Sequence, residues 1–145
     1  MVPVNVLMRG VAQRLDIPLD ELVARPPARK GRCMGDTRSL RARQVIQFVA
    51  HRKGRASYSE IGRRLSYDHA TVMHNVRRVS DFLQRRDELT IELYRTVIRV
   101  WTRLRLEEEA GRAEARRTMA TLLHPATIPT LLYGARPQVS MQENV

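Results

Sequence analysis

The chain has 145 residues, a hydrophobic fraction of 43% and a formal net charge of +11 at pH 7. This length suits one domain with a modest core and a tail, and the positive charge favours a polyanionic partner such as DNA, RNA or an anionic membrane surface. The chain opens without the basic segment and long apolar run of a signal peptide, and it lacks the ~18 consecutive apolar residues of a membrane span, so we expect a cytoplasmic protein with no membrane partner.

Residues 4–24 predict a helix followed by a shorter one. Val11 and Leu15 lie one turn apart on one face, and the run Asp16-Ile17-Pro18 then interrupts the pattern. Because proline is favoured in the first turn of a helix, the second helix is expected to begin near Pro18. Its apolar side consists of Leu19, Leu22 and Val23.

A basic segment from Arg25 to Gly35 contains prolines and glycines, which indicates an extended, mobile loop. Between Arg25 and Arg55 the chain has ten Lys or Arg residues and a single acidic residue, Asp36. The same region includes a helix over about residues 40–52, which either Thr37 or Ser39 can cap. Its inward-facing residues are Leu40, Val45, Ile46, Phe48 and Val49. A patch of positive charge is therefore expected here.

Residues 57–83 predict two helices joined by a tight turn. Ser57 and Glu60 have the spacing of a capping box, in which hydroxyl and carboxylate satisfy each other's backbone donors. Ser66 and Tyr67 make the turn, and Asp68 is placed to cap the next helix. The inward-facing residues are Ile61 and Leu65 on the first helix and Val72, Val76, Val79 and Leu83 on the second.

The second of these helices begins with small and polar side chains. Its leading and outer positions are Asp68, His69, Ala70, Thr71, His74, Arg77 and Arg78. Such groups suit a DNA major groove, so this pair of helices predicts a helix-turn-helix that binds duplex DNA.

Beyond Asp87 a helical stretch is expected to run to about Leu123, with a candidate break near Gly111. One apolar stripe comprises Leu89, Leu93, Val97, Val100 and Leu104 with Trp101 at its border, while Ile91 and Ile98 point to the opposite side. A helix with two apolar sides must bury both of them. Residues 88–106 are therefore expected to pack one side on their own domain and to offer the other to a second copy or another protein. The predicted organisation is a DNA-binding domain over 1–86, a helical extension over 87–124 and a loose tail over 125–145.

The sequence contains no believable motif of a catalytic or metal site and no set of nucleophile, base and orienting residue. Cys33 is the only cysteine, so the chain has no internal disulfide, and four scattered histidines do not complete a zinc finger with it. No glycine-rich loop ends in Gly-Lys-Ser or Gly-Lys-Thr, which would cradle the phosphates of ATP. We therefore expect no enzymatic activity, no cofactor, no metal and no small-molecule substrate.

Three segments carry a family resemblance: VAQRLDIPLDEL over 11–22, RARQV over 41–45, and SEIGR over 59–63 together with DHATVMH over 68–74. They resemble the C-terminal DNA-binding domain of the bacterial chromosomal replication initiator DnaA, over about Val4 to Phe82. The last pair is similar to that family's signature, Pro-Glu-Ile-Gly followed by Asp-His-Thr-Thr-Val-x-His. The resemblance implies an all-α helical bundle with a helix-turn-helix, here followed by the long helical extension.

In that family the Asp-His-Thr-Thr helix enters the major groove, and an arginine of the preceding basic loop reaches the minor groove. By position, the resemblance implies base contacts from Asp68, His69, Ala70 and Thr71, and phosphate contacts from Arg43 and Gln44. The chemistry agrees, because a carboxylate can accept from a cytosine amino group, an imidazole can donate to a purine, and a methyl group can contact the thymine methyl.

Five residues around this helix are further candidates for phosphate contacts: Ser59, Tyr67, His74, Arg77 and Arg78. Tyr67 can alternatively shield Leu65, and His74 can pack against a neighbouring helix. The two arginines can also form an ordinary solvated face.

The chain departs from the family pattern in four places. Ala70 replaces the first threonine of the signature, so a methyl contact replaces a hydroxyl contact. The turn is one residue shorter than the usual Phe-Gly-Gly-Arg. The basic loop is longer, which leaves the minor-groove residue open among Arg29, Lys30, Arg32, Arg38 and Arg41. No ATPase domain accompanies the match, so we expect binding without ATP.

We therefore expect a sequence-specific double-stranded DNA binder at initiator-box-like sites, associated with the nucleoid, that regulates replication initiation or transcription. The alternative is a helical adaptor or dimerising protein whose DNA binding is secondary and non-specific. An RNA or membrane binder is a third option, because charge alone supports it.

Overall fold

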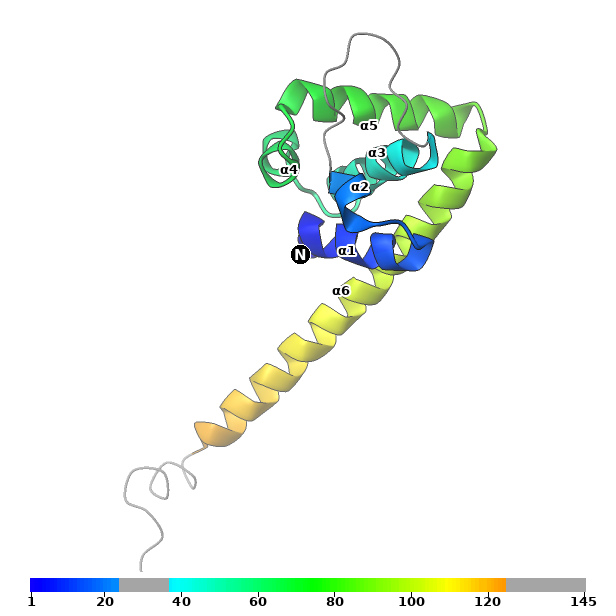
Figure 1. The fold of residues 1–145 in the computed structure, drawn as a ribbon. Helices are drawn as coiled ribbons and strands as arrows, with labels where there is room; N and C mark the ends of the chain where they lie inside the picture. The colour runs from blue at the N-terminus through cyan, green and yellow to red at the C-terminus, as the bar shows by residue number, and fades with distance from the viewer. Residues whose placement is uncertain (24–36, 125–145) are drawn as a thin grey trace, which may run out of the picture. The chain divides into compact units, whose positions relative to one another are not determined.

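The computed structural model describes residues 1–23 and 37–124, and the predicted basic loop and tail lie outside the described residues. The helices, in chain order, are α1 (Val4–Leu15), α2 (Leu19–Val23), α3 (Thr37–Arg52), α4 (Tyr58–Leu65), α5 (His69–Gln84) and α6 (Glu88–Leu122) (Figure 1). The predicted all-α fold with a long C-terminal helix is confirmed. None of these helices combines the length and the apolar character that crossing a bilayer requires.

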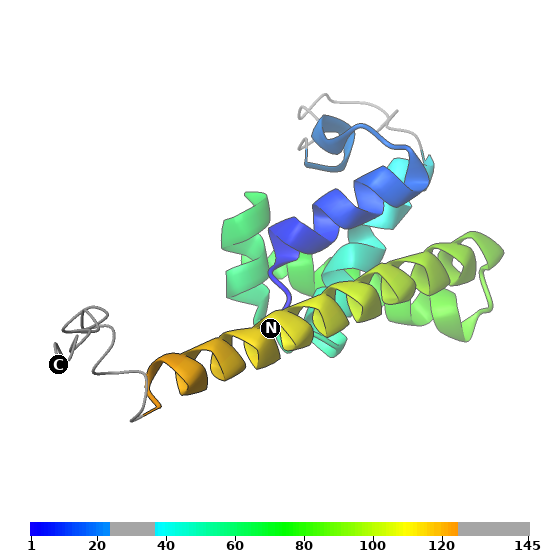
Figure 2. The same cartoon turned by 90° about the horizontal axis from the view of Figure 1, so that it is seen from below.

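The chain divides into two compact units, Met1–Glu108 and Glu109–Val145, and α6 contributes residues to both. In the first unit α3 is central and packs against α1, α2, α4 and α5. Figure 1 shows α3 between α5 and α1, and Figure 2, seen from below, shows α1 in front of α3. The domain boundaries predicted at 86/87 and 124/125 stay predictions.

The core of the first unit consists of one apolar stripe from each helix. Its fully buried members include Leu7, Val11, Leu22, Val45, Ile46, Val49, Ile61, Val72, Val76, Leu93 and Val97. The inner stripe of α5 is buried as its spacing predicted, with Leu83 half-buried at its end. In α2 only Leu22 is buried, whereas the predicted partners Leu19 and Val23 are exposed, because a helix of five residues turns only one position toward α3.

Two predicted helix boundaries need correction. Helix α3 already begins at Thr37, so neither Thr37 nor Ser39 precedes it as a cap. Ser39 is instead buried, and its hydroxyl donates to the Glu21 carboxylate at 3.3 Å, a tertiary contact that local spacing does not encode. Helix α6 runs through Gly111 without a break, since one glycine lowers helix stability by only about 1 kcal/mol and a long helix tolerates it.

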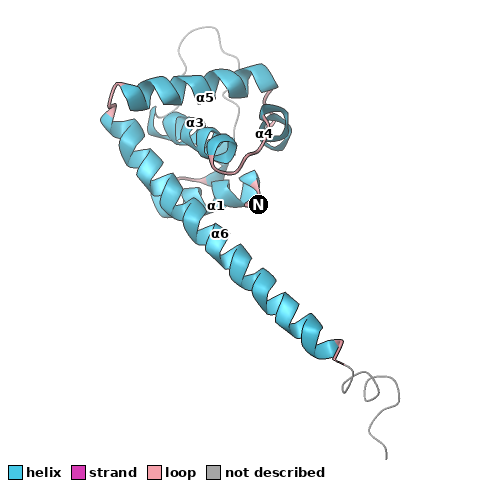
Figure 3. Cartoon of the chain, turned by 180° about the vertical axis from the view of Figure 1, so that it is seen from behind, coloured by secondary structure: helices cyan, strands magenta, loops and turns pink. Residues whose placement is uncertain are grey.

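The first part of α6 completes the core of the first unit. Leu93, Val97 and Val100 are buried, as the predicted stripe requires, and Ile98 and Trp101 pack against the same core. Gly10 on α1 allows the close approach, because a Cβ there would lie 2.8 Å from Cγ1 of Val100. Figure 3 shows α5 and the start of α6 meeting at a sharp corner.

That corner uses the same capping pattern as the start of α5. At α5, Asp68 is the residue before the helix and Thr71 lies in its first turn. At α6, Asp87 and Thr90 occupy the same two positions. The Asp87 carboxylate accepts from the Thr90 backbone N–H at 2.9 Å, from the Thr90 hydroxyl, and from Arg41 Nη1 at 2.8 Å. Both caps satisfy N–H groups that the helices would otherwise leave without partners.

These caps predict acid-sensitive stability. Hydrogen bonds from Thr90, with the nearby Arg41 guanidinium, lower the pKa of Asp87 below its ordinary value of 3.8. A carboxyl whose pKa is lower in the folded state stabilises above the unfolded pKa, and this stabilisation disappears as the pH falls below about 3.8. In urea titrations from pH 7 to pH 2, Asp87→Asn should therefore be less stable than the wild type at pH 7, and the difference should shrink below pH 4. A difference independent of pH would contradict this account.

Candidate nucleic-acid interface

Helix α4 begins with the cap that the sequence predicts. The Ser57 hydroxyl accepts from the Glu60 backbone N–H at 3.1 Å. The second half of the predicted capping box differs, because the Glu60 carboxylate lies 3.8 Å from Arg64 Nε, one turn along α4. Ile61 and Leu65 are buried on the inner side, so α4 packs on the bundle, and Ser57 caps its first turn.

The turn between α4 and α5 depends on Gly62 and Ser66. Ser66 adopts the left-handed conformation with φ 58°, and the Gly62 carbonyl accepts from the N–H groups of Ser66 and Tyr67. A Cβ on Gly62 would lie 2.5 Å from the Tyr67 carbonyl oxygen, which belongs to the backbone. Only glycine permits this close approach, which sets the placement of α5 against α4.

Gly62→Ala is therefore expected to lower the free energy of unfolding by about 1–3 kcal/mol, the usual cost of forcing extra volume into a packed site. Gly111→Ala is the matched control, because a methyl group there meets no atom within 4 Å and should only raise helix content. Thermal unfolding followed by circular dichroism measures both effects. Equal stability of the Gly62 variant and the wild type would show that the turn relaxes freely.

The first turn of α5 carries the predicted base-contacting residues. Asp68 Oδ1 accepts from the Thr71 N–H and Oδ2 from the Thr71 hydroxyl, both at 2.8 Å. These two hydrogen bonds lower the pKa of Asp68, so the carboxylate is ionised at neutral pH. Asp68, His69 and Ala70 are exposed, and Thr71 is half-buried with its hydroxyl engaged. The helix start thus offers a carboxylate, an imidazole and two methyl groups to a ligand.

The outer face of α5 continues this surface with positive charge. His74, Arg77 and Arg78 are exposed on the following turns, and the Arg78 guanidinium lies 5.6 Å from the centre of the Phe82 ring. Ser59 is exposed near the start of α4, and Tyr67 is half-buried in the turn. The helix-turn-helix therefore brings together the predicted contacts of residues 59–78 on consecutive elements, and their roles toward DNA stay predictions.

Arg43, for which the sequence predicts a phosphate contact, is buried and hydrogen-bonded within the bundle. It is 7% exposed, and its guanidinium donates to the carbonyls of Leu22 at 2.9 Å and Glu21 at 2.6 Å. A third donor reaches the Tyr67 hydroxyl at 3.0 Å. Arg43 therefore links the end of α2 to the turn before α5, and this geometry favours a structural role over a phosphate contact.

Gln44 is also buried, and it joins a polar network between α3 and α5. Its Nε2 donates to Asn75 Oδ1 at 3.3 Å, and Asn75 Nδ2 donates to Gln47 Oε1 at 3.0 Å. Sequence reasoning missed Asn75, although its position among Val72, Val76 and Val79 was a usable signal of a polar residue on the inner face. The network fixes the position of α5 along α3, because sliding α5 would leave buried amides without partners.

The candidates for the minor groove separate into three groups. Arg29, Lys30 and Arg32 lie outside the described residues. Arg41 is mostly covered: it binds Asp87 and Thr90, and its guanidinium lies 3.6 Å from the centre of the Phe82 ring. Arg38 is exposed at the start of α3 and forms an ion pair with Glu92 at 2.9 Å. The structure thus favours a supporting role for Arg41 and leaves Arg38 at the surface.

A capped, partly exposed helix that follows a tight turn, with polar groups at its start and arginines on its outer face, defines a helix-turn-helix DNA-binding domain. Residues 6–79 match the family described as bacterial dnaA protein helix-turn-helix, and the chain belongs to that family. This membership confirms the resemblance seen in the sequence and shows that the chain is a DNA-binding protein. No curated protein and no solved structure shows a significant match to it.

Proposed function

We propose that this protein binds double-stranded DNA in a sequence-specific manner at sites that resemble the boxes of the replication initiator. The observation that carries the proposal is the exposed start of α5, where Asp68, His69 and Ala70 project from a rigidly capped turn. Helix α5 is then the recognition helix and lies in the major groove. By occupying such boxes, the protein competes with the initiator or with transcription factors, and so regulates replication initiation or transcription on the nucleoid by binding alone.

The chemistry of the recognition helix supports specific contacts. Asp68 uses its two oxygens for the cap, yet each carboxylate oxygen has a further lone pair that can accept from a cytosine amino group. His69 can donate to a purine, and the methyl groups of Ala70 and Thr71 can contact thymine methyls. Arg77 and Arg78, about two turns further along α5, suit the phosphates on the groove edge.

Selection of bound duplexes from a random pool at physiological salt tests the proposal. Recovery of a base sequence that resembles an initiator box supports the proposal. A selected pool without any preferred base sequence would overturn it. Phosphate contacts release counterions, so the logarithm of affinity should fall linearly with the logarithm of salt concentration, with a slope of about −0.9 per contact.

Two variants should separate base contacts from phosphate contacts. His69→Ala is expected to lower the preference for the selected site over random DNA by roughly 5- to 150-fold. Arg77→Ala should weaken binding to both sequences similarly and reduce the salt slope by about 0.9. Arg9→Ala is the control and should leave both affinities unchanged, because Arg9 is exposed on α1, and α3 lies between α1 and α5 (Figure 1). Fluorescence anisotropy at several salt concentrations gives all three results; unaltered preference in His69→Ala would show that the recognition helix is wrongly assigned.

A further inference from the structure

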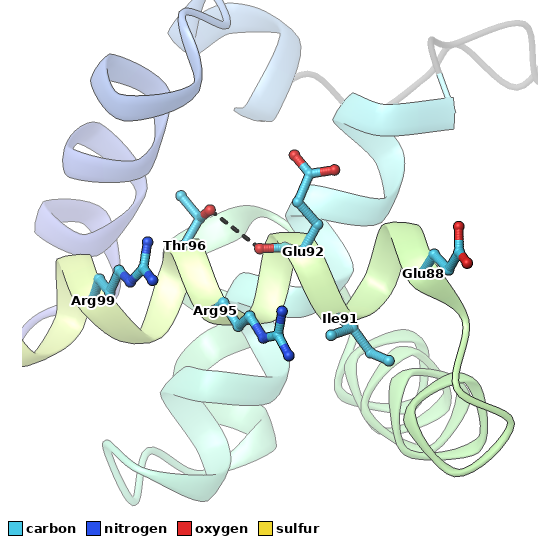
Figure 4. Close-up of a pocket in the computed structure, with 6 residues that line it drawn as sticks. All are labelled: Glu88, Ile91, Glu92, Arg95, Thr96 and Arg99. Carbon is cyan, nitrogen blue, oxygen red and sulfur yellow. Dashed lines mark hydrogen bonds between the residues drawn. The ribbon is translucent and has the colours of Figure 1, made fainter.

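Helix α6 has a charged face on the side opposite its buried stripe, within the first unit. An open groove of about 380 Å³ follows this face and is lined by Glu88, Ile91, Glu92, Arg95, Thr96 and Arg99. Figure 4 shows these side chains projecting from successive turns of α6. The acidic pair, Glu88 and Glu92, comes first, and the basic pair, Arg95 and Arg99, follows, so the face is divided into a negative half and a positive half.

This division is unfavourable for one helix in isolation. Glu88 and Glu92 are four residues apart, as are Arg95 and Arg99, and like charges at this spacing repel each other. Glu92 and Arg95, three residues apart, form the single attractive pair among these four residues, so repulsive pairs outnumber it. The same four residues in alternating order would instead form attractive pairs along the helix. A surface that separates its charges in this way gains most from an external partner with the complementary order of charges.

We propose that this face is the interface of a homodimer in which two α6 helices pack antiparallel. A two-fold axis between residues 93 and 94 places Glu88 opposite Arg99 of the second copy, and Glu92 opposite Arg95. The same axis places Ile91 beside Thr96. Because the interface is symmetric, each pair occurs twice, and every charged side chain of the face meets an opposite charge.

The contacts within one chain are compatible with this pairing. Glu92 also binds Arg38, through Oε1 at 2.9 Å, but its side chain remains 58% exposed and its second oxygen can accept from an arginine of the partner copy. The sequence predicts that Ile91 and Ile98 form a second apolar side of α6. Ile98 instead packs against the core of its own chain, and Ile91 alone of the two lines the groove. Electrostatic pairs on a surface are individually weak and screened by salt, so the dimer should be weak and salt-sensitive.

Sedimentation equilibrium of the full chain without DNA tests the inference independently of its DNA binding. The wild type should approach twice its monomer mass of 16.8 kDa at high concentration in ~50 mM salt, and should return to the monomer mass in ~500 mM salt. A wild type that stays monomeric at low salt overturns the proposal.

Two variants of identical composition test the register. Glu88→Arg with Arg99→Glu exchanges the charges of one predicted pair, so every contact across the axis stays attractive and the dissociation constant should change by less than about threefold. Glu88→Arg with Arg95→Glu places like charges at every contact and should raise the dissociation constant more than tenfold. Both leave Glu92 and Arg38 in place, and both create attractive pairs four residues apart within the helix. The second variant also places two carboxylates three residues apart, at 92 and 95, so helix content by circular dichroism is measured for both. Equal dimerisation of the two variants would overturn the antiparallel register.

Discussion

Arg43→Met should lower the free energy of unfolding of the first unit by about 3 kcal/mol, because it removes three hydrogen bonds and leaves one buried and one partly buried carbonyl without this donor. Those carbonyls belong to Glu21 and Leu22 at the end of α2, and the third bond holds Tyr67 in the turn before α5. The loss should therefore also loosen the placement of the recognition helix. Urea denaturation at neutral pH measures the stability, and anisotropy measures the affinity for the selected site.

Tyr67→Phe is the graded control for Arg43. It removes only the acceptor at 3.0 Å and should cost about 1 kcal/mol. The alternative role of Arg43, a phosphate contact, makes the opposite prediction: Arg43→Met would then leave the free energy of unfolding nearly unchanged and reduce the salt slope of DNA binding by about 0.9. The two readouts together decide between a structural residue and a DNA contact.

Local features of this fold could be predicted from the sequence because their causes are local. The Ser57 and Asp68 caps each join residues three positions apart, and the stripe of Val72, Val76 and Val79 follows from helical spacing alone. The signature that places α5 after a tight turn is likewise contained within residues 59–74. These features supply the helix-turn-helix and the exposed helix start.

The roles of the interior polar residues could not be predicted in the same way. Arg43 and Gln44 belong to the basic region, and nothing nearby in the sequence shows that their partners are the α2 carbonyls and Asn75. Arg41 meets Asp87, which is 46 positions away. Burial of these groups depends on how α3 is surrounded by other helices, which composition and periodicity do not report. A basic residue on a mostly buried helix is therefore a weak indicator of a DNA contact.

The position of Gly62 could be predicted from the sequence, but its structural role could not. The family signature includes this glycine, so the sequence indicated its position. The reason becomes clear only in the structure, where the Tyr67 carbonyl oxygen occupies the space that a Cβ on Gly62 would need. Gly111 carries the same residue type without any such contact, and the break predicted there was wrong. A glycine is informative where a close neighbour, as at Gly10 and Gly62, or a positive φ requires it.

Asp68→Asn should change which base the protein prefers without a large loss of stability. Asparagine caps helices about as well as aspartate, so α5 should remain intact. Its amide presents a donor beside an acceptor, which suits adenine, whereas the carboxylate suits a cytosine amino group. Selection with the variant should therefore alter one position of the bound sequence, with a change in discrimination of about 1–3 kcal/mol there.

Asp87→Asn makes this experiment interpretable, because Asp87 caps α6 with the same pattern of hydrogen bonds but lies after the end of α5. It loses the same charge and should leave the selected sequence unchanged. If Asp68 were only a cap, its asparagine variant would also select the wild-type sequence, and its affinity for every duplex would rise together, since a negative charge beside the phosphates would be removed. A shift confined to one base position, absent in the Asp87 variant, would assign Asp68 both roles: its hydrogen bonds to Thr71 hold the helix start in place, and its remaining acceptor sites contact a base.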